Sequence, residues 1–175
     1  MNDLVAAFET SAKEAAASVF FVDGVPGKVR GAVEELTRDA RSIVLGAGEF
    51  LPPPIVRELG NIPNVLREPT DEELSTAHAG VTDALAGVAS TGSVCVALGP
   101  PLVAAASLLM PLHVVILAAE RIVARPGDLF DLSCLEGGGL RRNIVFITGP
   151  SATADMGPLV RGVHGPQRLQ ILVVR

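Results

Sequence analysis

One long uncharged stretch limits what this chain can fold into. From Ala84 to Ala119 it contains no Lys, Arg, Asp or Glu, so this stretch must be shielded from water by lipid or by a protein core. A membrane-spanning helix needs about 20 continuous apolar residues, whereas Gly99-Pro100-Pro101 and Pro111 interrupt this stretch. Because proline breaks helices, we expect a strand, a helix and a second strand buried in a core, with no membrane insertion.

The overall composition agrees with an aliphatic core. Hydrophobic residues make up 49% of the 175 residues but aromatic residues only 3%, so Val, Leu, Ile and Ala must fill the interior. The formal net charge is −5, and the chain has neither a basic cluster nor an aromatic stacking platform, which argues against nucleic-acid binding. A chain of this length is usually one domain, and we expect residues 1–175 to form a single domain.

Hydrophobic periodicity predicts helices and strands that alternate along the chain. Helices are predicted within residues 1–20 and at 29–40, 55–59, 102–110 and 128–135. Another helix should begin after Thr70, because Thr70 and Glu73 form a capping-box pattern, and it should end near Gly80. Strands are predicted at 20–22, 42–45, 64–67, 81–86, 93–98, 113–117, 144–147 and 169–174. This alternation favours an α/β fold, with a mainly parallel sheet and helices on both faces.

The strand predicted at Ile144–Ile147 leads into the first candidate site. Its apolar, β-branched run ends in Thr148-Gly149-Pro150, which predicts a strand in the sheet interior. Ligands of open α/β sheets bind outside the carboxyl ends of strands, and Ser151, Thr153 and Asp155 follow this one. Such a loop can cradle an anion. Alternatively, its side chains satisfy turn backbone, with Asp155 as a helix N-cap.

Two other loops carry candidate residues. His164, next to Gly165-Pro166, can act as a general base or bind an anionic group, or it can hydrogen-bond a turn; His78 and His113 are weaker candidates. The three His are not at metal-ligand spacing, so no metal site is expected. No catalytic residue is assigned. We expect one ligand-binding crevice to be lined by Thr91, Gly92, Ser151, Thr153, Asp155 and His164.

Cysteine and glycine patterns predict no bound redox cofactor. Cys95 and Cys134 lie in apolar surroundings without a CxxC motif, so we expect buried reduced thiols and no iron–sulfur cluster. Gly46-Ala47-Gly48 resembles the start of a dinucleotide-binding turn, but Pro52-Pro53-Pro54 follows where the third glycine and the helix should stand. The beginning of the sequence lacks the basic region of a signal peptide, and the expected location is the cytoplasm.

Four motifs resemble the LUD domain family, the group similar to lactate utilisation protein C. They are Ser90-Thr91-Gly92-Ser93-Val94, Ser107-Leu108-Leu109-Met110-Pro111, Thr148-Gly149-Pro150-Ser151-Ala152-Thr153-Ala154-Asp155 and Gly162-Val163-His164-Gly165-Pro166. The similarity runs from about Val81 to the end of the chain. It implies a fold like that of the NagB/RpiA/CoA-transferase group, whose strand ends bind sugar phosphates or acyl-CoA.

The resemblance also implies a function. The first expectation is a non-redox subunit of a system that oxidises L-lactate to pyruvate, which binds a small anionic ligand or organises a complex of iron–sulfur oxidoreductase subunits. The alternative is a stand-alone isomerase or transferase that acts on a sugar phosphate or a CoA-linked substrate. Both stay open at this point, and so does whether the chain is itself an enzyme.

Overall fold

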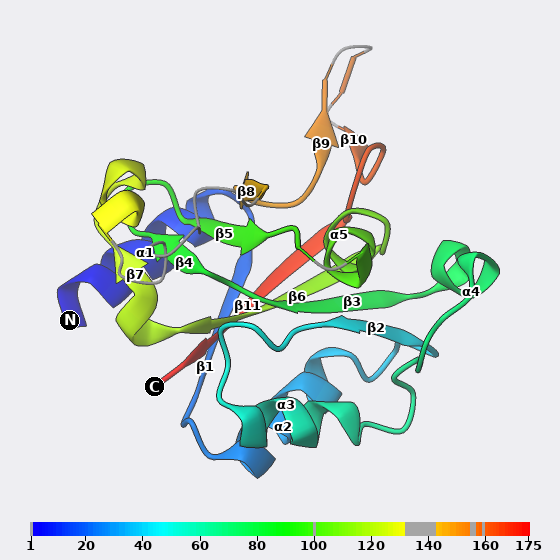
Figure 1. The fold of residues 1–175 in the computed structure, drawn as a ribbon. Coiled ribbons are helices and arrows are strands. Elements are labelled where there is room, and N and C mark those ends of the chain that lie inside the picture. Colours follow the sequence, from blue (N-terminus) through cyan, green and yellow to red (C-terminus); the bar gives the residue numbers. More distant parts are fainter. Residues whose placement is uncertain (1, 100, 132–142, 155–156, 159) are drawn as a thin grey trace.

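A parallel sheet forms the centre of the protein (Figure 1). The computed structural model describes residues 2–99, 101–131, 143–154, 157–158 and 160–175. Five parallel strands follow the order β1-β11-β6-β3-β2. Their bounds are β1 Ser18–Val22, β2 Ile43–Gly46, β3 Ala79–Asp83, β6 Leu112–Ala118 and β11 Arg168–Val174. Strand β3 is buried along its whole length, which is why its sequence shows no alternation of polar and apolar residues.

Two helices cover one face of this sheet. They are α2 (Pro26–Leu36) and α3 (Pro53–Gly60), which lie below the sheet in Figure 1. Val29 of α2 and Leu59 of α3 are fully buried and belong to one apolar cluster with Val114, Ile116 and Leu172 of the sheet. The short helix α4 (Asp71–Thr76) precedes β3.

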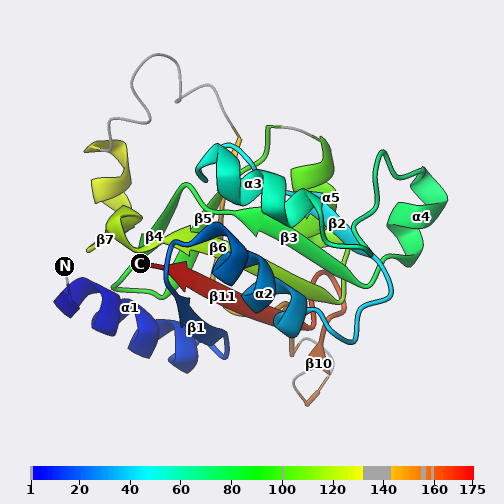
Figure 2. The same ribbon diagram turned by 90° about the horizontal axis from the view of Figure 1, so that it is seen from below.

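The other face carries helix α1 (Asn2–Glu14), helix α5 (Pro101–Leu108) and a second sheet (Figures 1 and 2). This smaller sheet has the strand order β7-β4-β5-β8. Its strands are β4 Ala86–Val88, β5 Ser93–Ala97, β7 Ile122–Val123 and β8 Ile144–Ile147. Phe8 of α1 and Val94 of β5 pack in one cluster with Val115 and Ile171 of the central sheet, so the smaller sheet is joined to the larger one through a shared apolar core.

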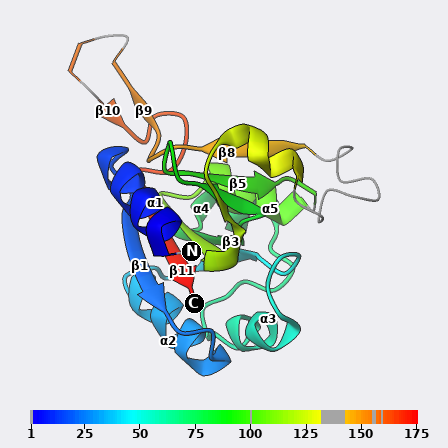
Figure 3. The ribbon, with the colours of Figure 1, turned by 90° about the vertical axis from the view of Figure 1, so that its left-hand side faces the viewer.

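Short elements complete the chain. Two 3-10 helices, η1 (Ala119–Arg121) and η2 (Pro126–Asp131), flank β7. The antiparallel pair β9 (Ala152–Thr153) and β10 (Val160–Arg161) forms a hairpin that projects from the body, as Figure 3 shows. None of the helices in the described ranges is long and apolar enough to cross a membrane.

The predicted fold class is confirmed, and so is the start of α4. The chain has a mainly parallel α/β sheet with helices on both faces. At α4, the N–H of Glu73 donates to Oγ1 of Thr70 at 3.3 Å, and the N–H of Thr70 donates to Oε2 of Glu73 at 2.8 Å. The helix ends at Thr76, before the predicted end near Gly80.

The prediction that Ile144–Ile147 lies in the interior of the parallel sheet is wrong. These residues form β8, the edge strand of the smaller sheet, and they pair antiparallel with β5. Phe146 is 41% exposed. A short β-branched run predicts a strand, but the sequence does not show whether one face or both faces of that strand will be covered.

Three other boundaries differ from the sequence-based expectation. The strand predicted at 81–86 is divided between β3 and β4, which belong to different sheets. The strand predicted at 64–67 amounts to one bridge between Ile43 and Val65. The helix predicted at 128–135 is the 3-10 helix η2 as far as Asp131, and its remainder lies outside the described residues. Local hydrophobicity alone does not report the boundaries of short apolar segments or which sheet they join.

Candidate functional site

A cavity of about 390 Å³ lies where β2 and β3 end. Open parallel sheets bind their ligands at this edge. The lining is mostly small and aliphatic, with two carboxylates. It comprises Leu45, Gly46, Ala47, Gly48, Glu49, Asp83, Ala97, Leu102 and Val103.

Two glycines bring helix α5 to this cavity. A Cβ on Gly46 would lie 2.8 Å from Cα of Val103, and a Cβ on Gly80 would collide with the backbone of Ala106. Because neither residue has a side chain, α5 lies directly on β2 and β3. Its first turn, with Leu102 and Val103, therefore borders the cavity.

Asp83 holds the loop that follows β2. Its Oδ2 accepts a hydrogen bond from the N–H of Gly48 at 3.0 Å and another from the N–H of Phe50 at 2.7 Å. The Asp83 residue is only 4% exposed. Hydrogen bonds to a carboxylate are stronger than those between neutral groups, so this contact fixes the loop over the end of β3.

Arg121 supports the same loop from the other side. The centre of its guanidinium group lies 5.3 Å from the centroid of the Phe50 ring, a cation–π contact. Its Nη1 donates to the carbonyl oxygen of Leu85 at 3.3 Å. The loop is thus attached both to the end of β3 and to η1, which gives the cavity one preformed wall.

The groups around the cavity have complementary polarity. Helix α5 begins with Pro101, which has no N–H, but the N–H groups that follow in its first turn lack partners within the helix and attract negative charge. They favour an anionic group at the start of α5. The carboxylates of Asp83 and Glu49 instead accept hydrogen bonds and repel anions. A small ligand with an acidic group at one end and a hydroxyl group at the other satisfies both requirements.

A buried histidine lies near the start of β6, opposite Gly80 of β3. His113 of β6 is fully buried, and its Nε2 lies 2.9 Å from Oγ1 of Thr82. Burial lowers the pKa of His113 to about 3, because an imidazolium loses its hydration there. His113 is therefore neutral at physiological pH and has a structural role between β3 and β6. His78 directly precedes β3, where its Nδ1 is 3.1 Å from Oγ of Ser42.

The predicted residues Thr91 and Gly92 lie in the turn between β4 and β5. Oγ1 of Thr91 is 2.7 Å from Oγ of Ser93, which is 2.7 Å from Oγ1 of Thr148. These three hydroxyl groups connect the turn to the end of β8. Gly92 has a φ of +66°, and a Cβ there would collide with the backbone of Ala12 in α1. Glycine is needed at this position for packing.

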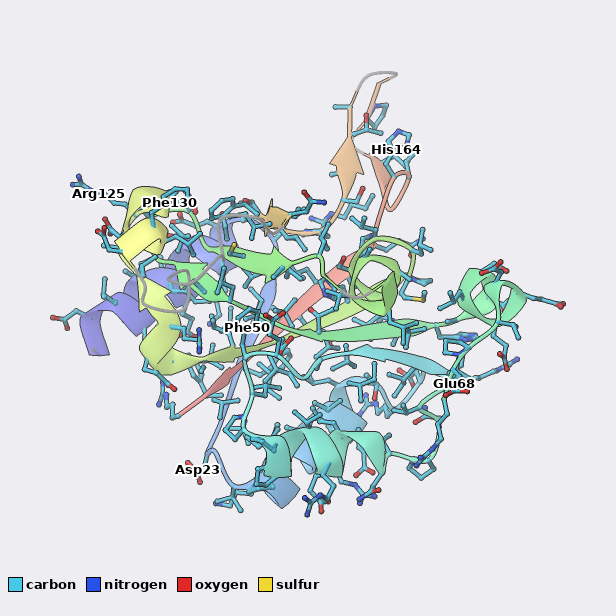
Figure 4. All side chains as sticks on the ribbon, in the orientation of Figure 1. Asp23, Phe50, Glu68, Arg125, Phe130 and His164 are labelled. Atoms are coloured by element: carbon cyan, nitrogen blue, oxygen red, sulfur yellow. The ribbon has the colours of Figure 1, made fainter. Side chains whose placement is uncertain are left out.

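Ser151 and the segment around His164 lie together. The N–H of Ser151 donates to the carbonyl of Pro166, and the N–H of Gly162 donates to the carbonyl of Ser151, both at 2.9 Å. Thr153 pairs with Val160 in the hairpin. His164 is exposed and lies well away from Phe50 and the cavity loop in Figure 4. Asp155 lies outside the described residues.

The five described residues among the six predicted ones thus fall into two groups. Thr91 and Gly92 pack near α1, and Ser151 and Thr153 lie with His164 at the hairpin; none of these five lines the cavity beside β2 and β3. That they bind a ligand together stays a prediction.

The sequence-based reasoning missed Asp83, Glu49 and the cavity role of Gly46–Gly48. One signal could have found Asp83. Asp83 is the one charged residue between Glu73 and Glu120. A lone carboxylate in a long apolar segment must find hydrogen-bond partners when the segment is buried.

Comparisons with known proteins agree with this architecture. The LUD domain model matches residues 6–174. An uncharacterized protein of Neisseria meningitidis serogroup B is 30% identical over 104 residues, which cover 59% of this chain and 45% of that protein. The match therefore spans less than half of that relative. The crystal structure of a DUF162 family protein from Deinococcus radiodurans has a TM-score of 0.73 at 21% identity and covers 99% of this chain and 98% of that one.

These findings extend the resemblance beyond the four motifs. The structural likeness, at its low identity, shows a shared fold. The family match begins at residue 6 rather than near Val81, so it includes the cavity loop after β2 and the end of β3. The chain belongs to the LUD domain family.

Proposed function

We propose that this LUD domain protein is a non-redox subunit of a lactate-utilisation system. In this role it holds a small hydroxy acid, such as L-lactate, while partner subunits carry out the oxidation to pyruvate. The observation that supports the proposal is the cavity of about 390 Å³ between the first turn of α5 and Asp83. Family membership supports the lactate-utilisation context.

The chemistry of lactate suits this arrangement. Its carboxylate group would lie at the start of α5, where helix N–H groups favour negative charge. Its hydroxyl group would donate to the carboxylate of Asp83 or Glu49, and its methyl group would contact the aliphatic lining. In the opposite orientation the ligand carboxylate would meet two like charges in a partly desolvated cavity.

A binding role is favoured over electron transfer and over acid–base catalysis. The sequence has two cysteines and no CxxC motif, whereas an iron–sulfur cluster is usually held by four cysteine thiolates. Oδ2 of Asp83 already accepts two backbone hydrogen bonds, which makes this carboxylate a holding group for the loop. We propose that iron–sulfur oxidoreductase subunits are the partners and that the complex works in the cytoplasm.

Calorimetric titration of the purified chain with L-lactate tests the binding role. Leu102 borders the cavity in the first turn of α5, and a glutamate there suits the helix terminus while it repels the ligand carboxylate. We expect Leu102→Glu to weaken L-lactate binding at least about tenfold, which is about 1.4 kcal/mol. The matched control is Leu109→Glu, because Leu109 is exposed and follows the other end of α5.

Two results would count against the proposal. One is the absence of binding heat for both L-lactate and pyruvate. The other is equal binding by the Leu102→Glu variant and the control. Turnover of a sugar phosphate or CoA ester by the chain alone would favour the isomerase or transferase alternative instead.

A further inference from the structure

The two carboxylate oxygens of Asp83 have different surroundings. Oδ2 accepts hydrogen bonds from the N–H groups of Gly48 and Phe50, whereas Oδ1 has no hydrogen bond from the described residues. In the described part of the chain, the fully buried side-chain atoms without a partner belong to His113 and Gln170. Oδ1 is therefore not sealed inside the protein. Because Asp83 lines the cavity beside β2 and β3, this oxygen is open to the cavity.

An open carboxylate oxygen requires a hydrogen-bond donor. An ionised carboxylate accepts hydrogen bonds and cannot donate one. Asp83 is only 4% exposed, so a ligand group that reaches Oδ1 displaces water from it and must replace the lost hydrogen bond. A hydroxyl group can do so, whereas a carbonyl oxygen would leave two acceptors facing each other.

The second carboxylate of the lining is less suited to discriminate between ligands. Glu49 is exposed, and water competes for hydrogen bonds to an exposed group. Asp83 is held in place by the two backbone N–H groups that it accepts, so its free oxygen is positioned before a ligand binds. We therefore expect Asp83 to determine which ligand groups this end of the cavity accepts.

L-lactate and pyruvate differ at the group that Asp83 would meet. Both acids have the same carboxylate, which would lie against the N–H groups in the first turn of α5. That end of the cavity does not distinguish them. The second carbon carries a hydroxyl group in L-lactate and a carbonyl group in pyruvate, and only the hydroxyl group can donate to Oδ1.

On the basis of the binding role proposed above, we propose that Asp83 makes the cavity selective for 2-hydroxy acids over the corresponding 2-oxo acids. Oδ1 accepts a hydrogen bond from the hydroxyl group of the 2-hydroxy acid. The 2-oxo acid has no donor at this position and brings a second acceptor against the carboxylate. The chain would then hold L-lactate and release pyruvate once the partner subunits have formed it.

Calorimetric titration of the full chain with L-lactate and with pyruvate tests this selectivity. A hydrogen bond to a charged group should make L-lactate bind at least about tenfold more tightly. In Asp83→Asn the amide oxygen can still accept the N–H groups of Gly48 and Phe50, while the amide NH₂ group replaces Oδ1 and donates. The carbonyl group of pyruvate then gains a partner, so the preference for L-lactate should fall at least about tenfold.

Glu49→Gln is the matched control variant. It removes one negative charge from the same cavity and leaves Asp83 unchanged. Because L-lactate and pyruvate carry the same charge, both should bind more tightly, and the ratio of their dissociation constants should stay at the wild-type value.

A ligand analogue keeps the test decisive if Asp83→Asn does not fold. In 2-fluoropropionate a fluorine atom replaces the hydroxyl group and cannot donate a hydrogen bond. The wild-type chain should bind this acid at least about tenfold more weakly than L-lactate. Equal binding of the two acids would contradict the role of Oδ1.

The results separate this inference from the binding role on which it rests. If neither L-lactate nor pyruvate binds, both proposals are overturned. If the two bind equally, or pyruvate binds more tightly, the selectivity alone is overturned. A preference for L-lactate that Asp83→Asn leaves unchanged, or that Glu49→Gln removes, would also overturn the assignment to Asp83.

Discussion

At the scale of single residues, His113 links burial to pH dependence. Its pKa falls from 6.5 in the unfolded chain to about 3 in the folded protein. Between these pH values the imidazole is protonated in the unfolded chain but not in the folded protein. The contribution of His113 to the free energy of unfolding is therefore fully present at neutral pH and is lost as the pH falls below about 6.5. We expect its contribution to stability to drop by about 2 kcal/mol between pH 7 and pH 5.

Urea unfolding of the wild type and of His113→Gln at both pH values measures this contribution. Glutamine keeps a polar partner for Thr82 but does not titrate. The variant should therefore lose about 2 kcal/mol less than the wild type over this range. An identical loss in both proteins would mean that folding does not lower the pKa of His113, because all other titrating groups are common to the two proteins.

At the scale of elements, the contact of α5 with the central sheet depends on Gly80. Gly80→Ala places a methyl group against the backbone of Ala106, so the helix must move. We expect a loss of about 1–3 kcal/mol in the free energy of unfolding. The control is Gly31→Ala in α2, where a Cβ would meet nothing within 4 Å. There alanine should stabilise the helix by about 0.5–1 kcal/mol.

Chemical denaturation of both variants, with L-lactate titration of the folded protein, checks this claim. If Gly80→Ala proves as stable as Gly31→Ala, then α5 does not depend on close approach to β3. If the Gly80→Ala variant binds L-lactate with the affinity of the wild type, then L-lactate binding does not depend on the position of α5.

The elements also show what the sequence can and cannot predict. The start of α4 was predictable because Thr70 and Glu73 satisfy each other within one turn. The break between β3 and β4 was not, because Ala84 and Leu85 are as apolar as the strands they separate and the change of sheet is made by distant partners. Likewise, the motifs predicted that Ser151 lies close to the His164 segment. They did not predict the cavity, because it is formed by β2, β3 and α5, which become neighbours only in the folded sheet.

At the scale of the whole molecule, the single-domain organisation of residues 1–175 stays a prediction. The apolar cluster that joins Phe8, Val94 and Ile171 connects α1, the smaller sheet and the central sheet. Parts that share a core should unfold together. Differential scanning calorimetry should therefore show one transition with equal calorimetric and van't Hoff enthalpies. Two resolved transitions would divide the chain into independent units.

The central claim is that the cavity at the ends of β2 and β3 is the ligand site of this LUD domain protein. The most direct measurement is an amide chemical-shift titration of the labelled chain with L-lactate. We predict shifts that saturate and that concentrate at Gly48, Phe50 and Leu102. Shifts confined to Ser151 and His164 would place the site at the hairpin instead, and a spectrum unchanged by L-lactate would contradict the claim.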